Sequence, residues 1–127
     1  MLLKIEFTSD VPIYEQIYKQ IIIELARGSL KKGEILPSVR QLASDLGVNL
    51  HTVNKAYQKL RDLGYVEMDR RFGSKIYDVI TSYDNPLSEI GDELLYLLGD
   101  LKNRNYEKEE ILALVEEVYT SMEEKHE

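Results

Sequence analysis

The stretch LPSVRQLASDLGVNLHTVNKAYQKLRDLGY, residues 36–65, holds two helical patterns separated by a turn of about three residues. The spacing predicts a helix that Ser38 opens and Gly47 closes, followed by a helix that Asn49 opens and Gly64 closes. Gln41 stands three residues after Ser38, the spacing of a capping box. On both segments the apolar residues recur every three or four positions, which predicts one buried face on each helix. These positions are Val39, Leu42, Ala43, Leu46, Val53, Ala56, Tyr57, Leu60 and Leu63.

The flanking sequence extends this pattern on both sides. Residues 1–7 alternate weakly and predict a short strand or an ordered arm. Asp10 as a capping side chain and Pro12 in the first turn predict a helix start, and the periodic apolar residues that follow end at Gly28. Residues 65–69 and 75–79 alternate around RRFGS, which predicts a β-hairpin. The expected order of elements in residues 12–79 is therefore helix, helix, tight turn, helix and β-hairpin.

The helix opened by Asn49 presents hydrogen-bonding groups opposite its apolar face. Its first acidic residue, Asp62, comes in the last turn. Amide and basic side chains near the start of such a helix suit reading of base edges in the major groove. The side chains on this outer face are His51, Asn54, Lys55 and Gln58, with Thr52 and Lys59 toward one edge.

The hairpin tip adds Arg70, Arg71 and Lys75, which could reach DNA backbone or a flanking groove. The residues alone leave alternatives open, because polar groups outside and apolar groups inside describe any surface helix. Arg40 could be a solvated arginine, and His51 a surface residue. A winged helix can also serve as a protein-interaction module, since fold alone does not fix function.

The charge is uneven along the chain. The net charge of −7 divides into 12 Lys and Arg against 10 Asp and Glu in residues 1–80, and 4 against 13 in residues 81–127. Salt screens charges beyond roughly 8–10 Å, so a distant acidic segment does not exclude binding of a polyanion. The sequence therefore permits a nucleic-acid-binding segment within an acidic protein.

Composition narrows the class further. With 43% hydrophobic and 31% charged residues, the chain can bury a core, and disorder is not expected. The absence of cysteine, of a signal peptide and of an apolar run near the ~20 residues of a membrane span predicts a cytoplasmic protein. Two histidines, no cysteine and no glycine-rich phosphate loop predict no enzyme, no metal site and no cofactor.

The pattern of residues 81–127 predicts two amphipathic helices. The first starts near Pro86, and residues 102–110 separate it from the second. Two such helices cannot bury both faces against each other, so we expect a second subunit to cover them. Packing back onto the first helix of the same chain is the alternative. The residues expected at the dimer interface are Leu87, Ile90, Leu94, Leu97, Leu98, Leu101, Ile111, Leu114, Val115 and Val118.

PIYEQIYKQI, the stretch LPSVRQLASDLGVNLHTVNKAYQKLRDLGYVE and the basic hairpin resemble the winged helix-turn-helix domain of GntR-type bacterial transcription regulators, over roughly residues 10–80. NLHTVNKAYQKL is most similar to the small YtrA-type branch, whose members end in a short helical pair that dimerises. The resemblance implies a mainly α fold with a small β-hairpin: a winged helix-turn-helix DNA-binding domain in residues 1–80 and a helical dimerisation segment in residues 81–127.

The resemblance also implies site residues. In the family, the arginine of the Pro-Ser-x-Arg segment contacts DNA, and its place in this sequence is taken by Arg40. A family wing tip has an arginine and two glycines around one residue, and Arg71 here replaces the first glycine, which puts the backbone of the tip in question. Many relatives carry a basic residue at the place of Asn54, so their operator cannot be transferred. The full set expected at DNA is Ser38, Arg40, Asn49, His51, Thr52, Asn54, Lys55, Gln58, Arg70, Arg71, Gly73 and Lys75.

Together these features predict a homodimeric, sequence-specific repressor that binds double-stranded DNA at a pseudo-palindromic operator. The seam between the last two helices could admit a small-molecule effector, although no polar groups converge there to identify one. Some relatives bind metabolites in large C-terminal domains, and we expect the roughly 47 residues that follow Ile80 to be too few for such a domain.

Overall fold

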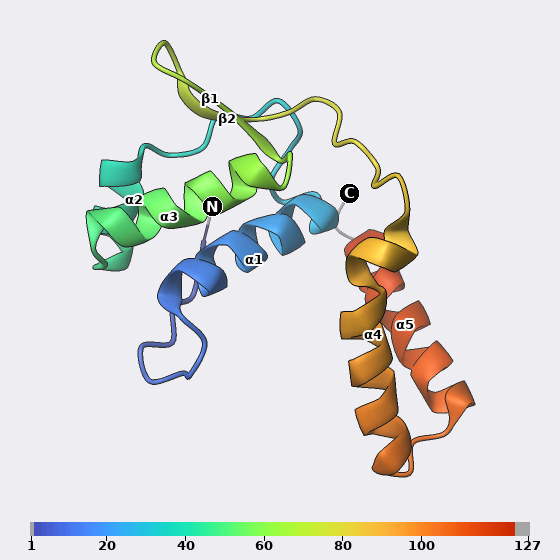
Figure 1. Cartoon of the computed structure of the whole chain (residues 1–127). Helices are drawn as coiled ribbons and strands as arrows, with labels where there is room; N and C mark the ends of the chain where they lie inside the picture. The colour runs from blue at the N-terminus through green and yellow to red at the C-terminus, as the bar shows by residue number, and fades with distance from the viewer. Residues whose placement is uncertain (1, 124–127) are drawn as a thin grey trace. The chain divides into compact units, whose positions relative to one another are not determined.

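The computed structural model describes residues 2–123. Within them the chain forms five α-helices and one two-stranded antiparallel sheet, in the order α1, α2, α3, β1, β2, α4, α5 (Figure 1). The chain divides into two compact units, one ending at Ile80 and the other beginning at Thr81. The predicted fold class, mainly α with a small hairpin, is confirmed. Residues 124–127, which complete the predicted C-terminal segment, lie outside the described residues.

α1 (Ile13–Arg27) ends as predicted, because Gly28 adopts the left-handed conformation (φ 82°) that closes a helix. Its start differs from the prediction. The residue at the N-cap position is Pro12, and no side chain caps the helix there. Asp10 lies in the bend before the helix and was wrongly predicted as its cap.

Residues 2–6 form an ordered arm along α1, one of the two alternatives that the sequence left open. Gln20 exchanges two hydrogen bonds with the backbone of Lys4, at 2.9 and 2.6 Å. Gln16 does the same with Glu6, at 2.9 and 3.1 Å. Two side-chain amides, one helical turn apart, thus form the backbone hydrogen bonds that a neighbouring strand would form.

α2 (Val39–Leu46) and α3 (Leu50–Asp62) confirm the predicted pair of helices and their tight turn. α3 packs against α1, α2 and β1. Tyr57 is fully buried, as predicted. The capping box forms only in part, because the Gln41 amide donates to Asp45 (2.7 Å) instead of reaching back to the start of the helix. The buried core consists of Ile17, Ile21, Leu30, Leu36, Leu42, Ala43, Val53, Ala56, Tyr57, Leu60, Val66 and Ile76.

The hairpin is tighter than predicted. β1 (Val66–Asp69) pairs with β2 (Gly73–Ile76), and the terminal pair is Asp69 with Gly73, so residues 70–72 form the tip. The predicted second strand, residues 75–79, began two residues too late, because Gly73 (φ 83°) already belongs to the ladder. On the other side of β2, Leu36 donates from its backbone N–H to Ser74 (2.8 Å), so the loop before α2 lies along the sheet.

The second unit contains α4 (Pro86–Asn103) and α5 (Lys108–Glu123). The connecting turn, residues 104–107, is shorter than the predicted interruption, and Asn105 within it has a positive φ of 69°. Both helices are amphipathic by sequence, yet neither has a buried residue in the described part of this unit. None of the helices within residues 2–123 is long and apolar enough to cross a membrane.

Candidate nucleic-acid interface

Local capping sets the start of both helices in the helix-turn-helix. The Ser38 hydroxyl accepts a hydrogen bond from the Gln41 backbone N–H (3.0 Å), and the Asn49 side-chain oxygen accepts one from the His51 N–H (2.7 Å). Gly47 makes the turn possible through its left-handed backbone (φ 67°). Both predicted caps are therefore present.

A buried tyrosine ties the two helices together. The Tyr57 hydroxyl of α3 donates to the Pro37 carbonyl (2.8 Å), immediately before the Ser38 cap. Burial raises the pKa of this phenol well above its usual value, so it remains a neutral donor. This bond fixes the start of α2, and with it exposed Arg40 in the first turn, relative to α3.

The outer face of α3 divides into a centre and two edges. His51 and Gln58 are exposed at the centre. On one edge half-buried Asn54 lines a shallow hollow of about 340 Å³ together with hairpin residues, including Arg70 and Gly73. On the other edge the Lys55 ammonium lies 4.1 Å from the centre of the Tyr14 ring of α1. Of the two side chains predicted toward an edge, Thr52 is half-buried and Lys59 is exposed.

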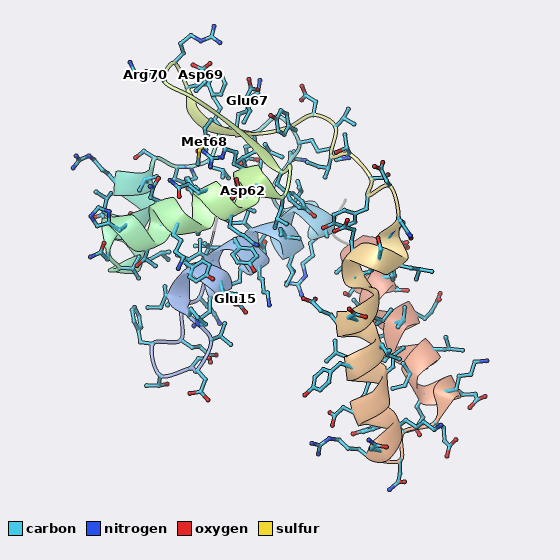
Figure 2. All side chains as sticks on the ribbon, viewed as in Figure 1. Glu15, Asp62, Glu67, Met68, Asp69 and Arg70 are labelled. Carbon is cyan, nitrogen blue, oxygen red and sulfur yellow. The ribbon has the colours of Figure 1, made fainter. Side chains whose placement is uncertain are left out.

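The hairpin tip has a defined structure. The Arg71 guanidinium donates two hydrogen bonds to the Asp69 carboxylate, from Nε to Oδ1 and from a terminal nitrogen to Oδ2, each at 3.0 Å. The Arg71 backbone N–H also donates to Asp69 Oδ1 (2.8 Å). Figure 2 shows Asp69 and Arg70 at the far end of the hairpin, with Met68 between the hairpin and α3. Arg70 is exposed and makes no hydrogen bond or ion pair with any residue in the described range 2–123.

The replacement of a family glycine by Arg71 does not strain the tip. In residues 2–123 the non-glycine residue with a positive φ is Asn105, so Arg71 has an ordinary backbone conformation. The Asp69 side chain closes the turn by accepting from the N–H two residues later, a common role for aspartate. The bonds from Arg71, first from its side chain and then from its backbone, hold the pKa of Asp69 below its usual value.

Three residues near the site were missed by the sequence analysis. Asp69 binds Arg71, and the Tyr14 ring lies beside the Lys55 ammonium. The Phe72 ring lies 5.4 Å from the Lys75 ammonium and 5.9 Å from the Arg71 guanidinium. The two-residue spacing of Asp69 and Arg71 was a usable signal, because it is the spacing of an aspartate-closed turn. The contact between Tyr14 and Lys55 had no local signal, since it depends on how α1 packs on α3.

In the C-terminal unit, the predicted interface residues are not covered. Leu101 and Ile111 are half-buried. The other eight are exposed, from 41% for Leu98 to 76% for Leu87. Near the turn, Leu98, Ile111 and Leu112 line an apolar hollow of about 490 Å³. No group of three or more His, Cys, Asp or Glu side chains within the described residues could hold a metal ion.

Comparison with known proteins gives a consistent result. The family model described as bacterial regulatory proteins, gntR family, matches residues 13–76. The HTH-type transcriptional repressor YtrA of Bacillus subtilis (strain 168) is 33% identical over 119 residues, which cover 92% of each chain. A transcriptional antiterminator from Listeria monocytogenes EGD-e has a similar structure, with a TM-score of 0.85, 32% identity and coverage of 96% of this chain and 92% of that chain. YtrA from Sulfolobus acidocaldarius, a GntR-family transcription factor, follows with a TM-score of 0.63, 38% identity and coverage of 77% and 97%.

A helix-turn-helix with a basic hairpin beside it defines the class of winged helix-turn-helix DNA-binding regulators. Within that class, the chain belongs to the gntR family of bacterial regulatory proteins. The predicted resemblance is confirmed, including its YtrA-type branch. The family consists of transcription regulators, which also confirms the prediction that the chain is not an enzyme.

Proposed function

We propose that this regulator is a repressor that binds a pseudo-palindromic operator as a homodimer. Its similarity to the Bacillus subtilis repressor YtrA extends over 92% of both chains, the C-terminal helices included. The observation that carries the proposal is the outer face of α3, where hydrogen-bonding side chains remain exposed between the hairpin and α1. Such a face, beginning at a capped helix N-terminus, suits the major groove.

The site residues fall into two groups by position. His51 and Gln58 at the centre of the α3 face, with Asn54 at its hairpin edge, are proposed to read base edges. The others are proposed to contact the DNA backbone and to set the register of the protein on the duplex. This second group comprises Ser38, Arg40, Asn49, Thr52, Lys55, Arg70, Gly73 and Lys75. Arg71 is left out of both groups, because its guanidinium is bonded to Asp69.

A second copy of the chain is the proposed cover for α4 and α5. Eight of the ten interface positions are exposed within the chain, and they recur at helical spacing on both helices. Leaving so many leucines and valines in water is unfavourable, and a symmetric dimer would bury the same surface on both subunits. Two readers related by a two-fold axis require two half-sites, about one helical turn (~34 Å) or a multiple of it apart.

Selection of random duplexes by the purified chain, followed by sequencing, tests this function. The expected result is an enriched palindrome, bound with a Kd of about 10⁻⁸–10⁻¹¹ M. A titration of the selected duplex and of a random-sequence duplex at two salt concentrations then separates base reading from charge attraction, because affinity for any duplex falls as salt rises, whereas base reading favours only the selected sequence. Weak binding without enrichment would contradict the proposal and favour a winged helix whose partner is another protein.

A further inference from the structure

The two adjacent arginines of the hairpin tip differ in their surroundings. Arg70 makes no hydrogen bond or ion pair within residues 2–123, whereas Arg71 donates three hydrogen bonds to Asp69. Both side chains are exposed, so burial does not explain the difference. The difference is that the Asp69 carboxylate accepts hydrogen bonds from Arg71 and none from Arg70.

Asp69 occupies this position because of the hairpin register. It is the last residue of β1 and pairs with Gly73 across the sheet, which brings its side chain over the three-residue tip. One oxygen accepts from the Arg71 backbone and from Nε, while the other accepts from a terminal guanidinium nitrogen (3.0 Å). A bidentate pair of this kind fixes the guanidinium in both position and orientation.

The pair has zero net charge at a place where DNA would meet the protein. If Arg71 left Asp69 for a phosphate, it would leave an unpaired carboxylate beside a polyanion, so the move brings no net positive charge to the duplex. Affinity for DNA of any sequence depends on the number of phosphates that unpaired cations neutralise. At the tip Arg70 meets that condition, and Arg71 does not.

We propose that Asp69 is a specificity-determining residue, which masks Arg71 and so limits the attraction of the hairpin tip to DNA of any sequence. The inference rests on the proposed function, because it assumes that the tip approaches DNA. By lowering the charge-driven part of binding, Asp69 would raise the relative weight of the base contacts made by α3. The ordinary backbone conformation of Arg71 fits this role, since the tip does not need Asp69 to relieve strain.

Asp69→Asn is the informative substitution. Asparagine retains a side-chain oxygen for the Arg71 N–H, and so keeps the turn, but it removes the charge that neutralises the guanidinium. The matched control is the double variant Asp69→Asn with Arg71→Gln, which has the same net tip charge as the natural pair. Thermal unfolding of each variant checks that the fold is retained.

The measurement is the dependence of Kd on salt for the full chain on a random-sequence duplex, between about 50 and 200 mM. For Asp69→Asn the log–log slope should steepen by about 0.9, equivalent to about 3.5-fold more loss of affinity over this range. The double variant should return to the slope of the unsubstituted chain. The ratio of operator to random-sequence affinity should fall in Asp69→Asn and recover in the double variant.

Two results would overturn the inference. An unchanged slope in Asp69→Asn would mean that Arg71 does not reach DNA even when it is unmasked. A double variant with a shallower slope than the unsubstituted chain would mean that Arg71 already contacts a phosphate despite its bonds to Asp69. Failure of the proposed function is distinguishable, because the unsubstituted chain would then show no preference for any selected duplex.

Discussion

The two units of this chain differ in how far they bury their apolar side chains. In the first unit α3 alone contributes four fully buried residues, namely Val53, Ala56, Tyr57 and Leu60. In the second, α4 and α5 contribute none within the described residues, and Leu97 and Leu98 remain 55% and 41% exposed. The first unit therefore has a core of its own, while the second leaves its apolar side chains exposed. The stability of the first should depend on its core packing and that of the second on subunit concentration.

The largest effect is expected from the core of the first unit. Leu60→Ala should lower the free energy of unfolding by about 2–5 kcal/mol, because it removes buried methyl groups and leaves a cavity. Urea denaturation followed by circular dichroism measures this loss. Leu97→Ala is the matched substitution in the second unit, and a loss of the same size measured on the monomer would show that the two units do not differ as described.

The second effect concerns the exposed stripe of α4. Leu94→Asp should convert the dimer to a monomer and weaken operator binding about 10²-fold or more, because the second half-site is no longer bound intramolecularly. Sedimentation equilibrium and an operator titration measure the two parts of this effect. Tyr96→Asp adds the same charge on the opposite side of the helix, at a side chain that is 74% exposed. Dissociation by both variants alike would contradict the assignment of the stripe.

An effect on binding alone should follow from Arg40→Ala. Arg40 is exposed in the first turn of α2, so its loss should weaken binding to all duplexes alike, reduce the log–log salt slope by about 1, and leave unfolding and dimerisation unchanged. Calorimetric titration of the operator gives the affinity, and sedimentation gives the mass. Unaltered affinity would remove Arg40 from the interface.

The smallest effect is expected at the start of α2. Ser38→Ala should cost about 1 kcal/mol of stability, because the Gln41 N–H loses its acceptor. Ser38→Asp should restore most of it, since aspartate is also a good cap. Ser44→Ala, at an exposed position within the same helix, is the control and should change stability by less than about 0.5 kcal/mol. Equal losses at both serines would show that capping is not the cause.

The sequence correctly predicted structural features that depend on a few neighbouring residues. Ser38, Gly47 and Asn49 marked helix ends correctly, because caps and left-handed turns depend on a few neighbouring residues. The periodicity of α3 correctly assigned Tyr57 to the core. Asp10 failed as a predicted cap, since nothing nearby distinguished a bend before the helix from its first turn.

Features that depend on packing or register were not predictable in the same way. The spacing of Asp69 and Arg71 indicated a turn, but the second strand, which completes the hairpin, was placed two residues too late. The bonds between Gln20 and Lys4 join residues 16 positions apart, and the contact of Lys55 with Tyr14 depends on the packing of α1 on α3. The DNA contacts of individual residues stay predictions, because they belong to a complex and not to the chain alone.

The mass of the complex formed on the selected duplex, determined by sedimentation, tests most directly whether the regulator binds its operator as a homodimer. We expect two chains on each duplex, with tight binding lost when the half-sites are moved apart by about half a helical turn, because a rigid dimer cannot reach both. One chain on each duplex, with an affinity that does not depend on half-site spacing, would contradict it.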